Sequence, residues 1–337
     1  MSRGSGPRLR SWRPGRALAL IVGLVIGAAV IWVSHPAAIW NSLQEVAALP
    51  LLGALVVNVP IVALRAIRAQ VVLNFLGHKV TFRSMVPVQL VGQTSSSITP
   101  AASGDYVRAY VWKRTQSVPL RDGAGVVTFE RLYSLYLLMA LAVLLIILPR
   151  HGAIGWVGVA VGLVAATLAP VAVELVAPPA IERWILTRAT SGRLLNRFAE
   201  GALGMVDNLR KLMRSPLLLI QTSAITLAIY VVSGYQVLLI VNSLGDSIRI
   251  TQAVGVYAIS QVGGILSTLP FGLGASDAIL VTVLAGYGVN VSVSATVAVL
   301  LRAVSTLPLA LAGLVAYMRL HGQTSPEPGA VAAAEGE

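Results

Sequence analysis

Residues 84–112 read SMVPVQLVGQTSSSITPAASGDYVRAYVW, an apolar stretch interrupted by Pro100 and Gly104. A proline inside a helix removes a hydrogen bond and clashes with the preceding turn, so it breaks or kinks the helix. Each half then holds about 13–17 residues, or about 20–25 Å of helix, which is short of a hydrocarbon core of about 30 Å. We therefore expect a re-entrant hairpin that enters and leaves the membrane on one side. The alternative is a proline kink in an ordinary spanning helix.

A second interrupted stretch, residues 253–286, reads AVGVYAISQVGGILSTLPFGLGASDAILVTVLAG and is cut by Pro270, Gly272 and Gly274. The two stretches resemble each other at an offset of about 170 residues, which indicates an internal repeat. The matching residues are Thr81 and Thr251, Val86 and Val256, Ser97 and Ser267, Pro100 and Pro270, Gly104 and Gly274, and Arg131 and Arg302. We therefore expect one broken hairpin in each half of the chain.

The composition is that of a membrane protein. Hydrophobic residues make up 56% of the chain and charged residues only 11%, whereas a soluble domain carries about 25% charge. The mean hydropathy is +0.80. The absence of cysteine excludes disulfides, thiolate metal sites and a cysteine nucleophile. The four histidines show no metal-ligand spacing, so we expect neither a metal nor a cofactor.

Six stretches are apolar over about 20 residues, the length that crosses a bilayer. They are Ala17–Val33, Pro50–Leu73, Gly123–Leu148, Gly152–Val176, Pro216–Val241 and Val293–Met318. The expected fold is an all-α polytopic membrane protein with these six transmembrane helices and two re-entrant hairpins. The expected segments are a basic stretch over residues 1–16, a first transmembrane helix over 17–33, a transmembrane domain over 34–321 and a disordered tail over 322–337.

Positive charge collects on alternate loops, which sets the orientation. Residues 1–16 carry five arginines and no acid, residues 34–49 carry neither lysine nor arginine, and residues 178–215 carry seven basic residues. Both termini are therefore expected in the cytoplasm, in a protein of the cell membrane. Because of this distribution, the net charge of +12 predicts membrane lipids as partners and not nucleic acid. Residues 178–215 form either an amphipathic helix on the inner membrane surface or a solvated connector.

In this orientation the two repeats, about residues 50–148 and about residues 216–320, run in opposite directions across the membrane. Their hairpins then enter from opposite faces, which is the inverted-topology repeat of many transporters. Non-helical backbone persists at membrane depth only where protein or a water-filled cavity surrounds it. The breaks are therefore expected to line a binding site, with Pro100, Gly104, Pro270, Gly272 and Gly274 at its walls.

Charged side chains at membrane depth are the candidate binding residues. Each costs roughly 2.5–3.5 kcal/mol to insert, so those present are paired or functional. They are Arg65, Arg68, Asp105, Arg108, Glu130, Arg131, Asp277 and Arg302. Asp105 or Glu130 can offset one arginine and leave another to hold a phosphate, which the guanidinium fork binds bidentately. The alternatives are structural ion pairs between helices and, for Arg65 and Arg68, side chains that snorkel to the interface.

Two further features favour an anion near the breaks. The run Gln93–Thr99 is rich in hydroxyls, which can satisfy freed backbone groups or line a hydrophilic path. Half-helices that begin after Pro100 and Pro270 would point the positive ends of their dipoles at the same place. The phosphate of a lipid head group is the natural ligand for such a site.

These motifs occur together in a known family. Over about residues 50–320 the chain resembles the lysylphosphatidylglycerol synthase transmembrane region, a flippase-like domain also found in small integral membrane proteins. The resemblance rests on Arg65-x-x-Arg68, Pro100-x-x-x-Gly104-Asp105-x-x-Arg108, Glu130-Arg131-Leu132, Pro270-Phe271-Gly272-Leu273-Gly274-x-x-Asp277 and Arg302. The family implies glutamate where this chain has Asp105 and Asp277, so the charge is kept and the reach is shorter. Multidomain members add a soluble aminoacyl-transfer domain; this chain ends soon after its last predicted helix, and that activity is not inferred.

Three functions are compatible with these residues. The preferred one is a translocator that moves an anionic phospholipid or a polyprenyl-phosphate-linked lipid between leaflets. The second is a non-catalytic membrane partner of a separately encoded lipid-modifying transferase. The third, an enzyme acting on a lipid head group, needs a positioned base or nucleophile, and only Glu130, Asp105 and Asp277 could serve. We therefore expect no catalytic residue.

Overall fold

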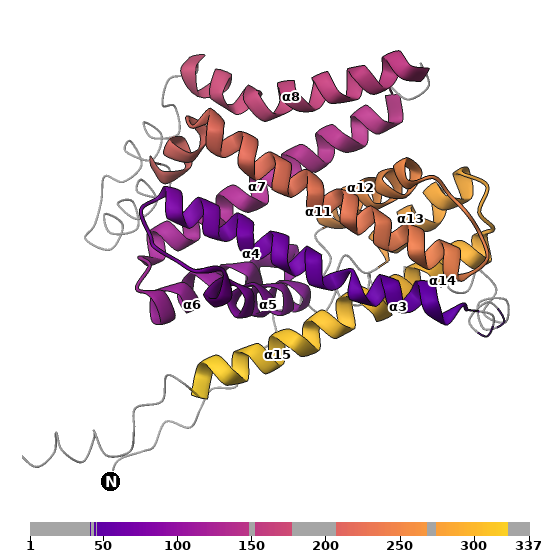
Figure 1. The fold of residues 1–337 in the computed structure, drawn as a ribbon, viewed down its shortest axis with the longest axis horizontal. Helices are drawn as coiled ribbons and strands as arrows, with labels where there is room; N and C mark the ends of the chain where they lie inside the picture. Colours follow the sequence, from indigo (N-terminus) through magenta and orange to yellow (C-terminus); the bar gives the residue numbers. More distant parts are fainter. Residues whose placement is uncertain are drawn as a thin grey trace, which may run out of the picture.

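The computed structural model describes residues 41, 44, 46–147, 152–176, 207–267 and 274–322, and the secondary structure in these ranges is entirely helical (Figure 1). The labelled helices are α3 (Ala48–Val56), α4 (Asn58–Phe75), α5 (Phe82–Ile98), the 3-10 helix η1 (Pro100–Tyr106), α6 (Val107–Gln116), α7 (Leu120–Ile147), α8 (Gly152–Val176), α11 (Pro216–Ser243), α12 (Ile250–Leu266), α13 (Ala275–Gly286), α14 (Val291–Leu301), the π-helical turn η4 (Arg302–Thr306) and α15 (Leu307–Gly322).

Four helical stretches within the described ranges are long and apolar enough to cross a membrane. They are Ala48–Phe75, Leu120–Leu145, Pro216–Ser243 and Val291–Leu320, which confirms four of the six predicted spans. Helix α8 has the predicted bounds, but only Gly155–Val171 of it qualifies, as a shorter apolar helix. The predicted first span, Ala17–Val33, lies outside the described residues, as do most of the 178–215 connector and all but the first residue of the 322–337 tail.

The first interrupted segment folds into a helical hairpin. Helix α5 ends at Ile98, Thr99 adopts an extended conformation (φ −110°, ψ 142°), and η1 begins at Pro100. The chain returns along α6, where the Gln116 side-chain amide donates to the Ser84 carbonyl at 3.3 Å. The two arms therefore begin and end at the same place, and the break lies at the tip.

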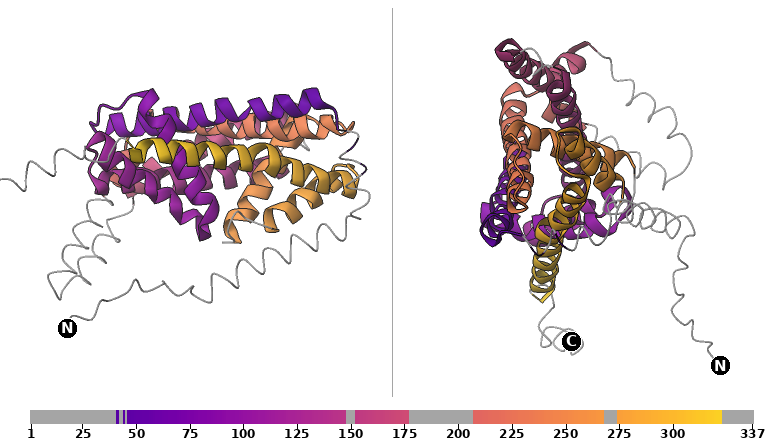
Figure 2. Two further views of the ribbon diagram at one scale, coloured as in Figure 1. Left: turned by 90° about the horizontal axis from the view of Figure 1, so that it is seen from below. Right: turned by 90° about the vertical axis from the view of Figure 1, so that its right-hand side faces the viewer.

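The second interrupted segment forms a hairpin from α12 and α13. Its arms lie so close that a Cβ atom on Gly264 would stand 2.9 Å from the Ser276 Cβ. Gly274 precedes α13 with φ of 79°, a conformation that only glycine adopts without strain. Pro270 and Gly272 lie outside the described residues. Figure 2 shows the two hairpins at opposite ends of the long helices, with their arms converging towards the middle.

Helix α4 and helix α11 are antiparallel neighbours whose contacts are reciprocal. Arg68 of α4 donates to the Thr226 hydroxyl (3.1 Å), and Gln236 of α11 donates to the Asn58 side chain (3.2 Å). Thr226 follows Asn58, and Gln236 follows Arg68, by the same offset of about 170 residues. This is the pattern of a two-fold contact, in which one residue pair repeats with its partners exchanged.

Two pairs of contacts between the halves follow the same exchange. Helix α5 of the first half packs on α15 of the second, and α12 of the second half packs on α7 of the first. Within each half, α6 packs on α7 and α13 packs on α14. Each half therefore places its hairpin partly against a long helix of the other half, so the two halves cannot separate without exposing both hairpins.

The ends of α4 and α11 also match. Gly77 and Gly245 follow these helices with φ of 93° and 80°. Each donates its N–H to an asparagine carbonyl, Asn74 at 3.0 Å and Asn242 at 3.2 Å. Left-handed glycines of this kind end helices because they carry no Cβ. The two turns share the sequence Asn-x-Leu-Gly, which is a further similarity between the two halves of the chain.

Close packing of α11 on α12 depends on Gly234, where an added Cβ would stand 2.6 Å from the Val254 Cα. We expect Gly234→Ala to lower the free energy of unfolding by about 1–3 kcal/mol, because backbone rather than a flexible side chain must move. Thermal unfolding of the purified protein in detergent measures this change. The matched control is Gly286→Ala, since nothing lies within 4 Å of the added methyl group there. Equal unfolding temperatures for the two variants would contradict the packing.

Candidate functional site

The centre of the candidate site is Arg108, whose side chain is only 1% exposed. Its Nε lies 2.8 Å from Asp105 Oδ1, one helical turn back at the tip of the first hairpin. Its Nη1 lies 2.7 Å from Glu130 Oε2 on α7 and also donates to the Gln89 side chain of α5 at 2.8 Å. The spacing of Asp105 and Arg108 that predicted a shared face is thus confirmed, and the guanidinium joins both hairpin arms to α7.

Helix α4 contributes Arg68 to the same network. Arg68 Nε donates to Glu130 Oε1 at 3.2 Å, and its Nη1 donates to the hydroxyls of Ser134 (2.7 Å) and Thr226 (3.1 Å). The side chain therefore points into the bundle and not to the membrane interface, against the snorkelling alternative. Glu130, whose side chain is 1% exposed, accepts from two arginines on two different elements.

Two further arginines lie at the more accessible edge of this network. Arg131 Nε lies 3.1 Å from Asp105 Oδ2, and its side chain is 29% exposed. Arg65 donates to the Gln93 side chain of α5. The cluster thus holds four arginines, Arg65, Arg68, Arg108 and Arg131, against the carboxylates Asp105 and Glu130. These side chains together carry two positive charges in excess.

Two glycines let the hairpin close around Arg108. A Cβ on Gly92 would stand 2.4 Å from the Arg108 Cγ, and one on Gly104 would stand 2.1 Å from the Ser95 carbonyl oxygen. The Gly104 N–H donates to the Thr99 hydroxyl at 2.6 Å, which bridges the break. Gly104 is therefore needed for close approach of the two arms.

The hydroxyl-rich run before the break is largely satisfied within its own helix. Ser96 and Ser97 donate to the Gln93 carbonyl, and Thr99 donates to the Ser95 carbonyl at 2.9 Å. Thr94 bonds back to Leu90 at 3.1 Å and faces α15. These bonds favour the first of the two predicted roles, which is to satisfy backbone groups near the break.

The second hairpin carries a smaller, matching pair. Arg302 forms a bidentate ion pair with Asp277. Its Nε donates to Oδ1 at 2.9 Å and its Nη2 donates to Oδ2 at 2.7 Å. Asp277 also accepts the Gly274 N–H at 3.0 Å. The positive end of α13, which the sequence suggested for an external anion, is therefore already capped by a carboxylate of its own first turn.

The two halves share one ion pair and differ in the other. Asp105 pairs with Arg131 in the first half, and Asp277 pairs with Arg302 about 170 residues later in the chain. Leu280 follows Asp277 by three residues, as Arg108 follows Asp105, and Leu301 directly precedes Arg302, as Glu130 precedes Arg131. The buried charge network thus belongs to the first half alone. Among residues with described placement, no group of three or more His, Cys, Asp or Glu side chains could hold a metal ion.

Sequence reasoning missed the neutral partners of the cluster. Gln89 and Gln93 lie four residues apart on α5, so they share one face and each meets an arginine. Their spacing in an apolar helix was the available signal. Ser134 and Thr226 gave no comparable signal, because they come from two helices that are distant in the sequence.

The helices and the buried arginine cluster define a polytopic helical membrane protein. The family model for the lysylphosphatidylglycerol synthase TM region matches residues 20–313, so the chain belongs to this family and the resemblance is confirmed. The chain is 26% identical over 321 residues to a UPF0104 membrane protein of Methanothermobacter thermautotrophicus, which covers 89% of this chain and 94% of that protein. It is also 33% identical over 79 residues to Glycosyltransferase AglD of Haloferax volcanii, which covers 23% of this chain and 13% of that protein.

Glu130 offers a direct test of the cluster. We expect Glu130→Gln to lower the free energy of unfolding by about 3–5 kcal/mol, because it removes the carboxylate that buried Arg108 shares with Arg68. Thermal unfolding in detergent measures the loss. The double variant Arg108→Met/Glu130→Gln should recover part of it, since the buried charge is removed together with its partner. A double variant less stable than Glu130→Gln alone would contradict this account.

Proposed function

We propose that this protein translocates an anionic lipid, either a phospholipid or a polyprenyl-phosphate-linked lipid, between the leaflets of the membrane. The observation that carries the proposal is the excess positive charge of the Arg65, Arg68, Arg108 and Arg131 cluster at the tip of an interrupted helix. Arginines at membrane depth are costly unless they are paired or bind a ligand. Two carboxylates offset two of these charges, and an anionic ligand would offset the others.

The proposed architecture is an inverted-topology repeat with one re-entrant hairpin in each half. It is supported by the exchanged packing of α5 on α15 and of α12 on α7, and by the reciprocal contacts of α4 and α11. The hairpins lie at opposite ends of the long helices (Figure 2). Transporters of this kind bind substrate near the midplane, between the repeats, and alternate access by moving one repeat against the other.

Arg131 and Arg65 are proposed to hold the phosphate. Of the arginines in the cluster, Arg108 is the most deeply buried and is held by two carboxylates, so it positions the hairpin. Arg131 is the more accessible partner of Asp105, and Arg65 donates a hydrogen bond to a neutral amide, that of Gln93. A guanidinium on each side of the break can bind phosphate oxygens through two parallel hydrogen bonds.

The carboxylates favour transport over lipid chemistry. An acid–base or nucleophilic mechanism needs a group that is positioned to exchange a proton or to attack. Asp105, Glu130 and Asp277 each lie in ion pairs with arginine instead. Such pairs hold helices and charges in place.

A second candidate is a non-catalytic membrane partner of a lipid-modifying transferase. It is favoured by the similarity to a segment of Glycosyltransferase AglD and by the family description, which is that of the TM region of a synthase. In this role the chain would present a lipid to an enzyme rather than move it. A soluble transferase that co-purifies with the chain, together with no transport by the chain alone, would support this candidate.

Reconstitution into liposomes with head-group-labelled lipids tests the translocator. We expect the wild-type chain to move labelled phosphatidylglycerol or a labelled polyprenyl phosphate faster than empty liposomes. Arg131→Gln and Arg65→Gln should each slow this movement about ten-fold or more, because each removes a charge-assisted hydrogen bond worth about 1.5–3 kcal/mol. Protection of the label from a membrane-impermeant quencher measures the rate.

The control is Lys113→Gln, which removes one positive charge from an exposed position on α6. It should leave the rate unchanged. Equal rates for wild type, Arg131→Gln and Arg65→Gln would remove the assignment of the phosphate ligands. No movement above empty liposomes for either lipid would overturn the translocator and favour the partner of a transferase.

A further inference from the structure

The apolar stretch Val291–Leu320 is interrupted in its middle by the π-helical turn η4. Here the Leu307 N–H donates to the Arg302 carbonyl, five residues back, where an α-helix uses the fourth. Pro308 explains the interruption, because it has no N–H to donate to the carbonyl four residues before it, that of Val304. The Val304 carbonyl therefore lacks its α-helical donor.

The side chain of Asn58 supplies a donor from the other half of the chain. Its Nδ2 lies 2.7 Å from the Val304 carbonyl oxygen, and its Oδ1 accepts from the Gln236 side chain at 3.2 Å. Asn58 and Gln236 are both buried, at 6% and 3% exposed. Membrane helices tolerate proline where a neighbouring side chain satisfies the freed backbone group. Asn58 of α4 therefore stabilises the interrupted helix in its present form.

The two parts of this helix, before and after η4, are attached to different hairpins. Before the turn, α14 packs on α13, and Arg302 forms its ion pair with Asp277 of the second hairpin. After the turn, α15 packs on α5, and the Thr94 hydroxyl of the first hairpin lies 3.2 Å from the Ala310 carbonyl oxygen. A movement of one hairpin against the other that keeps these contacts therefore bends the helix at η4.

Helix α7 makes a matching pair of contacts without such a turn. It packs on α6 of its own half and on α12 of the other half. Residues Leu120–Ile147 contain no proline and are α-helical throughout. Of these two helices, α7 is therefore the rigid one, and the helix through η4 is the one that can change its bend.

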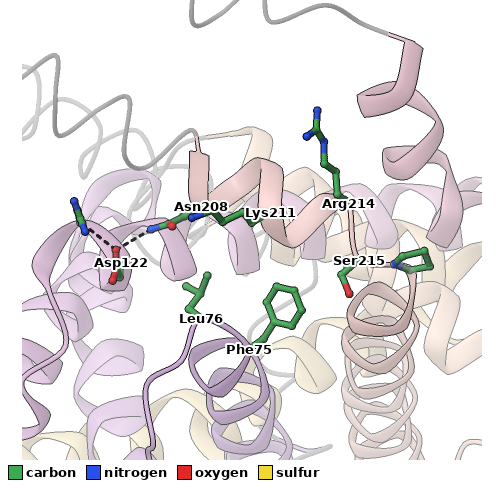
Figure 3. A pocket seen from close by; sticks show the side chains of 9 residues that line it. Phe75, Leu76, Asp122, Asn208, Lys211, Arg214 and Ser215 are labelled. Carbon is green, nitrogen blue, oxygen red and sulfur yellow. Dashed lines mark hydrogen bonds and ion pairs between the residues drawn. The ribbon is translucent and has the colours of Figure 1, made fainter.

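At the end of α4 opposite Asn58, polar contacts tie the two halves. Asp122, at the start of α7, accepts from the Asn208 side chain at 2.9 Å, in the stretch that leads into α11 (Figure 3). Asp122 also lies 2.9 Å from the His78 ring, in the turn after α4. A pivot at this end gives the larger displacement towards the other end, where Asn58 meets η4.

We propose that η4 is a hinge about which α15 and the first hairpin turn against α14 and the second hairpin. Asn58 is the positioning residue that holds the hinge in the arrangement described above. In a second arrangement the bend differs and the bond from Asn58 to the Val304 carbonyl is broken. Hinges of this kind place the change in a few residues between rigid parts. The device does not depend on which ligand the chain binds or on whether it translocates lipid.

Distances between spin labels, measured by double electron–electron resonance on the full chain in detergent, test the hinge. The chain has no cysteine, so labels attach only where cysteine is introduced. Thr282→Cys on α13 with Leu314→Cys on α15 spans η4. Tyr110→Cys on α6 with Leu314→Cys joins two elements on one side of it. All three positions are exposed.

We expect Asn58→Leu to raise the ratio of a second Thr282–Leu314 distance to the first about three- to thirty-fold, because one interhelical hydrogen bond is lost. The Tyr110–Leu314 distance should stay unchanged. No change in the Thr282–Leu314 distribution would overturn the hinge. An equal change in both distances would also overturn it, because α15 would then be leaving the first hairpin instead of bending at η4.

Pro308→Ala tests the hinge from the opposite direction. It returns a backbone N–H to the helix, so the Val304 carbonyl no longer depends on Asn58. This variant alone should narrow the Thr282–Leu314 distribution of the wild type, and Asn58→Leu added to it should have no further effect. A width equal to that of the wild type would contradict the proposal, whether or not Asn58→Leu folds by itself.

The matched control is Gln70→Leu. It removes a comparable hydrogen bond, from the Gln70 amide to the Val80 carbonyl at 3.1 Å, within the first half. Both distances should stay as in the wild type, and an effect as large as that of Asn58→Leu would remove the special role of Asn58. The readout is a distance within the purified chain, so a failure of lipid movement in liposomes leaves it unaffected.

Discussion

The buried guanidinium of Arg108 is the constraint on which the first half of the bundle depends. It is nearly inaccessible and takes one carboxylate, Asp105, from its own hairpin and another, Glu130, from α7. A buried pair that loses one partner costs several kcal/mol, so the hairpin tip cannot leave α7 without a large penalty. The ion pairs therefore fix the break in the helix at one depth. Arg65 and Arg131, which lie beside the same carboxylates and amides, are held there with it.

The two halves share a packing scheme but not a charge pattern. Where the first half has Arg108 and Glu130, the second has Leu280 and Leu301. At the second hairpin, the described residues include the ion pair of Arg302 with Asp277. Among the described residues, the excess positive charge therefore lies at the first hairpin and not at the second.

Local chemistry explains what the sequence could predict. The breaks follow from proline and glycine, four long helices follow from continuous apolar runs, and the Asp105–Arg108 contact follows from helical spacing. The partners of Arg68 could not be predicted, because they depend on which face of α4 turns inward. The matched turns at Gly77 and Gly245 could have been predicted from the Asn-x-Leu-Gly sequence that both share. The number of spans and the depth of the hairpins depend on the lipid boundary, which no single residue encodes.

The two halves are also joined through side-chain amides at the bundle centre. Asn58 donates to the Val304 carbonyl at 2.7 Å, within the π-helical turn that begins at Arg302. Gln236 of α11 donates to the Ala54 carbonyl (2.8 Å) and to Asn58. A π-helical turn changes the regular i→i−4 hydrogen bonds of the helix backbone. The Asn58 side chain donates to a carbonyl within this turn. Interhelical hydrogen bonds in membranes contribute about 0.6–2 kcal/mol each, less than the buried ion pairs. These hydrogen bonds add to the packing of α5 on α15 and of α12 on α7, which joins the halves through apolar surface.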